Sequence, residues 1–194
     1  MKDLKFIVMT CEGREHLAKR IIEQLPEVIV NFDNFKSSGK FNSTAWFNYV
    51  RNLELAGEDA CVQLEDDIIL CDDFKNKIQK AISEYPDYLI QFFSMRKKDI
   101  EVGTRFEPGG NFLMHQCYYL PKGMAKKIRE YSDKFYELTD CFFAPNDVCT
   151  REFLRENKLK YVIYCPNLVD HMEERSKVDK RRSTKRQSKT FKQV

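Results

Sequence analysis

The sequence predicts an α/β domain with a mainly parallel central sheet that is flanked by helices. Short apolar runs typical of strands alternate along the chain with longer segments of helical periodicity. Proline and glycine separate these segments, and no internal repeat interrupts the alternation. The 194 residues, of which 42% are hydrophobic, suffice for one core. We therefore expect one compact domain.

The first elements alternate between strand and helix. Leu17, Ile21 and Leu25 share one face of a predicted helix, which Pro26 ends. Ser43 is a candidate N-cap for a second helix. In chain order we expect a strand over 5–10, a helix over 16–25, a strand over 27–32 and a helix over 43–55.

The middle of the chain begins with CVQLEDDIIL, residues 61–70, which predicts a third strand although it holds three consecutive acids. A helix over 74–85 and a fourth strand over 88–94 follow it. Residues 95–112 are charged and contain several glycines. We expect them to form a long loop or lid.

The last third predicts a strand over 113–120, a helix over 122–132, a helix over 148–156 and a strand over 161–164. Residues 173–194 hold nine Lys and Arg against three acids. The expected organisation is a domain of residues 1–172 and a flexible, basic C-terminal tail of residues 173–194.

Several protein classes lack their usual signals in this sequence. No apolar run reaches the ~20 residues that cross a bilayer, and the N-terminus lacks the pattern of a signal peptide, so we expect a soluble protein of the cytoplasm, or of the host cytoplasm if a phage encodes it. The seven cysteines form no C-x-x-C pair, which disfavours a zinc site or a disulfide framework. Phosphate-binding GxxxxGK[ST] and GxGxxG loops and an EF-hand pattern are also missing.

The acidic triplet Glu65-Asp66-Asp67 follows a predicted buried strand. Ligands of open α/β sheets collect at the carboxyl ends of the strands, where this triplet should emerge. Clustered carboxylates repel one another unless a positive group lies between them, and Mg²⁺ and Mn²⁺ prefer oxygen ligands completed by substrate phosphates. An ordinary solvated turn is the alternative, which the apolar flanks CVQL and IIL disfavour.

A set of motifs in a fixed order resembles glycosyltransferases of the GT-A fold, in particular the lipopolysaccharide and collagen glycosyltransferase group and family 2 enzymes. The matching positions are TCEGR at 10–14, a strand ending at Asp33, WFNY at 46–49, LEDDIIL at 64–70 with Phe74 beyond it, CYYLPKGMA at 117–125 and CPNLVDH at 165–171. The resemblance covers about residues 5–176. It implies a GT-A, Rossmann-like fold.

The resemblance also implies roles for individual residues. The acidic triplet would take the place of the family's DxD motif, although it is Glu-Asp-Asp here. Asp67 and His171 would be ligands of Mn²⁺ or Mg²⁺. The nucleotide-sugar donor, with a UDP-sugar favoured, would contact Thr10, Arg14, Asp33, Glu65 and Asp66.

An acceptor hydroxyl benefits from a general base, for which the sequence offers two candidates. Asn146-Asp147 resembles the "E-D" element of family 2, whose Asp is the base in inverting members, and Asp140 is the second choice. The structural alternative for Asp147 is an N-cap of the helix that follows.

The tail suggests the acceptor, because a row of Lys and Arg attracts phosphates. The residues concerned are Lys177, Lys180, Arg181, Arg182, Lys185 and Arg186. We expect a metal-dependent glycosyltransferase that acts on a hydroxymethylated base in DNA, as some phage enzymes do. A membrane or glycolipid surface such as lipopolysaccharide is the less favoured partner of the tail, and a solvated tail without a partner is a further alternative. Rival hypotheses are a metal-dependent nuclease or phosphotransferase and a nucleic-acid-binding module without activity.

Overall fold

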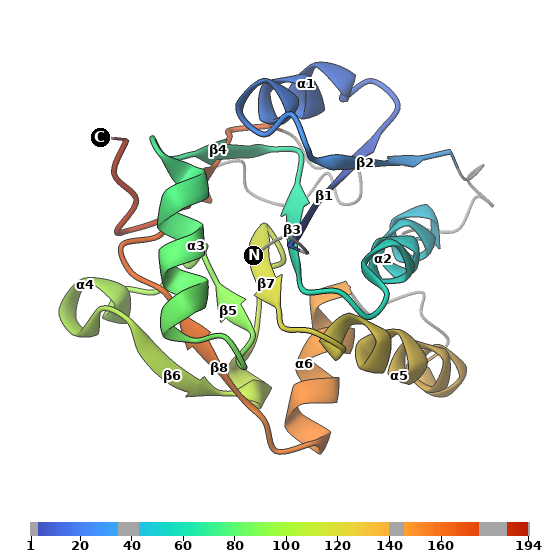
Figure 1. Cartoon of the computed structure of the whole chain (residues 1–194). Helices are drawn as coiled ribbons and strands as arrows, with labels where there is room; N and C mark the ends of the chain where they lie inside the picture. The colour runs from blue at the N-terminus through green and yellow to red at the C-terminus, as the bar shows by residue number, and fades with distance from the viewer. Residues whose placement is uncertain (1–3, 35–42, 140–145, 175–185, 194) are drawn as a thin grey trace.

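The computed structural model describes residues 4–34, 43–139, 146–174 and 186–193 (Figure 1). The strands are β1 Lys5–Cys11, β2 Ile29–Asp33, β3 Cys61–Glu65, β4 Ile68–Leu70, β5 Ile90–Gln91, β6 Arg105–Pro108, β7 Cys117–Leu120, β8 Lys160–Ile163 and β9 Val169–His171. The helices are α1 Glu15–Gln24, α2 Ser43–Ala56, α3 Phe74–Glu84, α4 Lys98–Val102, the 3₁₀ turn η1 Gly109–Asn111, α5 Met124–Thr139 and α6 Asn146–Glu156.

Seven of the strands in these described ranges form one sheet in the order β2-β1-β3-β7-β5-β8-β6. The pairings give β2, β1, β3, β5 and β8 one direction, whereas β7 and β6 run the opposite way. The predicted α/β class with a mainly parallel sheet is therefore confirmed. The carboxyl ends of β1, β2 and β3 meet at one edge of this sheet.

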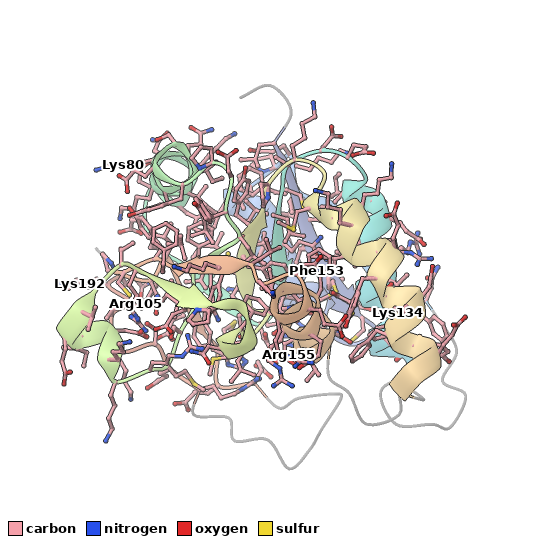
Figure 2. The ribbon with its side chains drawn as sticks, turned by 90° about the horizontal axis from the view of Figure 1, so that it is seen from below. Lys80, Arg105, Lys134, Phe153, Arg155 and Lys192 are labelled. Carbon is pink, nitrogen blue, oxygen red and sulfur yellow. The ribbon has the colours of Figure 1, made fainter. Side chains whose placement is uncertain are left out.

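Helices cover both faces of the sheet, because alternate side chains of a strand point to opposite faces. Phe6 and Val8 of β1 pack in one apolar cluster with α1 and α3, and Ile7 packs in the other with α2, α5 and α6. Figure 2, in which Lys80 marks α3 and Lys134 marks α5, shows these two helices on opposite sides of the sheet. The domain is thus a three-layer sandwich.

The prediction of one strand over residues 61–70 is wrong. The chain leaves the main sheet after Glu65, whose N–H donates to Gln116, and β4 then pairs with β9 in a separate ribbon. A continued strand would place Asp66 and Asp67 on opposite faces of the sheet, each within an apolar layer. The break instead lets both carboxylates turn toward the same partner.

The lid predicted over residues 95–112 is also wrong, since this segment forms α4, β6 and η1, and β6 pairs with β8 at the edge of the sheet. Its charges pair with one another: Arg105 lies 2.8 Å from Asp99 and 2.7 Å from Glu107, and all three side chains are nearly buried. A charged composition therefore marks an internal ion-pair network here. Two predicted strands are shorter than expected, at Ile90–Gln91 and Cys117–Leu120.

Residues 186–193, expected to belong to a flexible tail, lie against the domain. Phe191 packs against the apolar cluster of α1 and α3, and the Ser188 N–H donates to Asp170 Oδ1 at 2.7 Å. The domain boundary at residue 172 stays a prediction. Within the described ranges, no helix combines the length and the apolar character that a membrane span requires.

A candidate active site at the carboxyl edge of the sheet

A buried ion-pair cluster forms where β1 and β3 end. The Arg14 guanidinium lies 2.7 Å from Oδ1 of Asp66 and 2.7 Å from Oδ2 of Asp67, and the two carboxylates are 5% and 4% exposed. The Thr10 hydroxyl donates to Asp66 Oδ2 at 2.8 Å. The strand ends that the sequence predicted to meet do so, and Arg14 is the positive group between the two acids.

The local backbone explains why Arg14 reaches the acids. The turn after β1 contains Gly13 at φ +77°, a conformation that glycine adopts without a steric penalty. Arg14 then stands at the N-cap position of α1, and its side chain makes no cap hydrogen bond. Because β1 lies directly beside β3 in the sheet, the side chain is free to extend toward the end of β3.

The two aspartates differ in electrostatics although they share Arg14. Burial raises the pKa of Asp66 to about 6, against the lowering effects of the Arg14 charge and the Thr10 hydrogen bond. Burial would also raise the pKa of Asp67, but the hydrogen bond and charge of His171 and the charge of Arg14 hold it well below its usual range. Asp67 therefore keeps its negative charge to a lower pH than Asp66 does.

Glu65 lies at the end of β3, where Gln116 Nε2 donates to its Oε2 at 3.2 Å. Burial raises its pKa to about 7, the negative charge of Asp67 adds to this rise, and the charges of Arg186 and His171 oppose it. The carboxyl group of Glu65 thus titrates near neutral pH.

His171 enters the site from β9, which pairs with β4 through Ile68. Its Nε2 lies 3.3 Å from Asp67 Oδ2 and also contacts Nη2 of Arg186. The structure thus brings Asp67 and His171 together, and their role as metal ligands stays a prediction. Arg186, expected to reach outward to a polyanion, instead lies in the same cluster.

The residues of this cluster offer one clear oxygen to a divalent ion. Among the described residues, no three His, Cys, Asp or Glu side chains are arranged to hold a metal. However, Asp67 Oδ1 is buried and has no hydrogen-bond partner within the described ranges. Since Mg²⁺ and Mn²⁺ are usually held by one or two carboxylates together with substrate phosphates, Asp67 fits such an ion once a diphosphate is present.

Asp147 lies at the same edge of the sheet. It sits in the first turn of α6, and its Oδ2 accepts a hydrogen bond from the Met114 N–H at 3.2 Å. Met114 and Gln116 both lie just before β7, and Gln116 donates a hydrogen bond to Glu65. Asp147 Oδ1 is buried without a partner among the described residues. The role of base stays a prediction, and the second choice, Asp140, falls outside those residues.

Asp33 ends β2 opposite Cys11 of β1. Strand β1 therefore lies between Asp33 and the end of β3, beyond which Asp66 and Asp67 follow. Its expected contact with the nucleotide stays a prediction. The predicted polyanion-binding residues of the tail other than Arg186 all lie outside the described ranges: Lys177, Lys180, Arg181, Arg182 and Lys185.

A buried polar chain beneath the site was not predicted. Asn31 Nδ2 donates to Asn52 Oδ1 at 2.9 Å, Asn52 Nδ2 donates to Gln63 Oε1 at 2.9 Å, and the Tyr118 hydroxyl donates to the same oxygen at 3.2 Å. The available signal was Gln63 within an apolar strand and Asn48 and Asn52 one turn apart on the apolar side of α2. These hydrogen bonds link α2 to β2, β3 and β7, although Asn31 Oδ1 and Asn48 Oδ1 stay without a partner among the described residues.

A separate groove of about 790 Å³ lies between α2 and α5 and includes none of the residues of the acid cluster. Its lining residues are Trp46, Phe47, Val50, Arg51, Glu54, Arg129, Asp133, Tyr136 and Glu137.

The comparisons with known proteins identify the fold. No protein-family model and no curated protein sequence matches the chain. Among solved structures, the chain resembles the CTP:phosphocholine cytidylyltransferase from Streptococcus pneumoniae, with a TM-score of 0.50 and 12% identity over 88% of this chain and 93% of that one. A putative glucose-1-phosphate thymidylyltransferase from Bacillus anthracis follows, with a TM-score of 0.45 and 10% identity over 87% and 89%. The first likeness shows a Rossmann-like nucleotidyltransferase fold and, at this identity, the fold alone.

Proposed function

We propose that the chain is a glycosyltransferase that takes a sugar from a nucleotide-diphosphate donor and transfers it to a hydroxyl. One observation carries the proposal: the buried residues Asp66, Asp67, Arg14 and His171 and the half-buried Arg186 form a cluster at the carboxyl edge of a Rossmann-like sheet. Ligands of such sheets bind at this edge. The ordered motifs of the sequence support sugar transfer as the reaction.

The chemistry of the cluster suits a diphosphate leaving group. Negative charge grows on the diphosphate as the glycosidic bond breaks, and fixed positive groups at that position lower the barrier. A bound Mg²⁺ or Mn²⁺ would neutralise part of this charge, and Asp67 would hold it. Asp66 would keep Arg14 in place, because its two oxygens bind the guanidinium and the Thr10 hydroxyl.

The acceptor side of the reaction involves Asp147. Its Oδ1, which has no hydrogen-bond partner among the described residues, would accept the proton of the attacking hydroxyl. Asp140 is the alternative base.

The acceptor itself is a second, finer proposal. We propose a hydroxymethylated base in DNA, on the strength of the basic residues between 177 and 185. A labelled sugar should pass to duplexes that contain 5-hydroxymethylcytosine and not to duplexes with cytosine. Transfer to lipopolysaccharide instead would refute the DNA acceptor while supporting the glycosyltransferase.

The fold likeness suggests one competing function, nucleotidyl transfer, because one of the matching solved structures is a cytidylyltransferase. The two reactions release different products. A glycosyltransferase frees a nucleoside diphosphate from a nucleotide-sugar. A nucleotidyltransferase instead joins the nucleotide of a nucleoside triphosphate to a phosphorylated substrate and frees pyrophosphate from the triphosphate.

The experiment therefore offers the protein two substrate panels in parallel, each with Mn²⁺ and with EDTA. One panel contains UDP-, GDP- and TDP-sugars, and the other contains nucleoside triphosphates with sugar phosphates or phosphocholine. We expect nucleoside diphosphate release in the first panel only. Pyrophosphate release in the second would replace the proposal with nucleotidyl transfer. In a separate incubation with DNA and Mn²⁺, cleavage of the DNA without any donor would point to the nuclease alternative.

A further inference from the structure

The two arginines of the cluster differ in how their charges are balanced. Arg14 faces two carboxylates at 2.7 Å, so its charge is matched by protein groups. Arg186 faces the imidazole of His171. Within the described ranges Arg186 makes no ion pair with a carboxylate, and its Nε is buried without a hydrogen-bond partner. A half-buried guanidinium that has no carboxylate partner among the described residues and one buried, unused N–H favours an added anion.

The chain holds Arg186 in this position by a compact anchor, residues 188–191. The Ser188 N–H donates to Asp170 Oδ1 at 2.7 Å, and the Ser188 hydroxyl donates to Asn167 Oδ1 at 2.6 Å. Thr190 Oγ1 accepts the Asn167 N–H at 3.0 Å. Asp170 and Asn167 belong to the segment that also carries His171. Arg186 and His171 are therefore fixed by the same piece of structure.

The anchor also has an apolar part. Phe191 packs against the buried cluster under α1 and α3, and the N–H groups of Thr190 and Phe191 both donate to the Ser188 hydroxyl. In Figure 1 the red end of the chain accordingly lies beside β4, which pairs with β9. The position of Arg186 thus depends on several mutually supporting contacts.

We propose that Arg186 binds the phosphate oxygens of the donor, and that residues 188–191 hold its guanidinium at the site. This inference rests on the proposed function, because it names the residue that would take up the diphosphate. It separates Arg186 from the remaining basic residues of the tail. Arg14 would organise the carboxylates, and Arg186 would supply a charge that no carboxylate of the described residues pairs with.

Arginine suits this role because its planar guanidinium donates two parallel hydrogen bonds to a phosphate. Near Arg186 lie the imidazole of His171 and the carboxyl of Glu65, whose pKa the charge of Arg186 lowers. A diphosphate would give this charge a stronger partner than the imidazole. Lysine at the same position would keep the charge and lose the paired hydrogen bonds.

The test measures binding by titration calorimetry. The probes are inorganic pyrophosphate, the nucleoside diphosphates UDP and GDP in separate titrations, and uridine. For Arg186→Ala we expect about 10- to 100-fold weaker binding of pyrophosphate and of the preferred nucleoside diphosphate, the loss typical of charge-assisted hydrogen bonds. Uridine, which carries no phosphate, should bind both proteins equally. Arg186→Lys should bind pyrophosphate and the nucleoside diphosphate more weakly than the wild type and more tightly than Arg186→Ala.

Lys189→Ala is the matched control, since Lys189 lies in the same segment, is exposed and carries the same charge. It should bind all probes like the wild type. Ser188→Ala keeps the guanidinium but weakens the anchor, so it should reduce pyrophosphate binding even if Arg186→Ala does not fold. Circular dichroism checks the fold of each variant.

The outcomes separate the two proposals. Equal pyrophosphate binding by wild type and folded Arg186→Ala, or no pyrophosphate binding by the wild type, overturns the role of Arg186. Arg186-dependent pyrophosphate binding without any nucleoside diphosphate binding supports the anion site and overturns the proposed function. Equal losses in Arg186→Ala and Lys189→Ala would show a nonspecific effect of charge and would also overturn the inference.

Discussion

Arg14 Nη2 lies 2.7 Å from Asp67 Oδ2, and the two side chains are 11% and 6% exposed. The sequence alone suggested that a metal ion would separate the clustered carboxylates, but this contact shows that a guanidinium already does so. A buried pair of this kind contributes little relative to apolar residues of the same volume. Breaking it from one side is costly, because the other charge stays buried without a partner.

Arg14→Ala should therefore destabilise the protein strongly. Both Asp66 and Asp67 lose their cation, and removal of one partner from a buried pair costs about 3–5 kcal/mol. Urea denaturation measures this loss. The control is Arg155→Ala, because Arg155 is 61% exposed in its pair with Glu152 and should cost less than about 1 kcal/mol. Similar losses of stability in the two variants would show that the buried ion pairs of Arg14 contribute no more to stability than an exposed ion pair.

A second prediction concerns the polar chain beneath the site. Asn52→Ala removes one of the two acceptors of Asn31 Nδ2 and one of the two donors to Gln63 Oε1, so that each group keeps one unsatisfied hydrogen-bonding position. Asn52 is fully buried, and unsatisfied buried polar groups cost about 1–3 kcal/mol each. We expect a loss of at least about 2 kcal/mol in urea denaturation. Asn76→Ala, which removes an exposed contact with Asp73, should be close to neutral. A near-neutral Asn52→Ala would mean that water replaces the lost partner.

The sequence predicted the elements whose periodicity is strong. The apolar face of α1 with Leu17 and Ile21, and the first strand β1, both appear within a residue or two of their expected bounds. Local pattern sufficed because each of these elements buries one continuous face. It also predicted that Asp67 and His171 share a site, although 104 residues separate them, since matching motifs place both at one edge of the sheet.

Other features depend on tertiary partners that local pattern does not reveal. The charges of Asp99, Arg105 and Glu107 indicated a solvated loop, because their pairing across α4 and β6 leaves no trace in the periodicity. Likewise, the basic composition around Arg186 indicated solvent exposure. Its return to the site depends on Ser188 meeting Asn167 and Asp170, which are distant in sequence.

A third prediction addresses the reaction. Asp67→Asn should lower sugar transfer by at least about 100-fold, because the variant loses the ionised carboxylate whose buried Oδ1, without a hydrogen-bond partner in the described ranges, would hold the divalent ion. Product formation with saturating donor and Mn²⁺ measures this effect. Asp72→Asn changes an exposed acid just beyond the same stretch and should retain full activity. Wild-type rates in Asp67→Asn would remove this carboxylate from the site.

The last prediction concerns His115, a buried side chain that stacks on Tyr118 and lies 3.0 Å from the Thr150 hydroxyl. Burial lowers the pKa of its imidazole from 6.5 to about 4, and the charge of Asp147 opposes this effect only in part. Between these two values the unfolded chain binds a proton at His115 and the folded protein does not. The free energy of unfolding should therefore rise as the pH increases from about 4 to about 6.5, and then level off.

His115→Gln should flatten this rise by an amount on the order of 3 kcal/mol, which corresponds to the difference between the two pKa values. Urea denaturation of wild type and variant at intervals between pH 4 and pH 8 measures the difference, in which the titrations of shared carboxylates cancel. His16→Gln is the matched control, because His16 is exposed and should leave the wild-type pH profile unchanged. If His115→Gln and wild type have parallel profiles, the imidazole is charged in the folded protein, and the buried contacts with Tyr118 and Thr150 must then accommodate a cation.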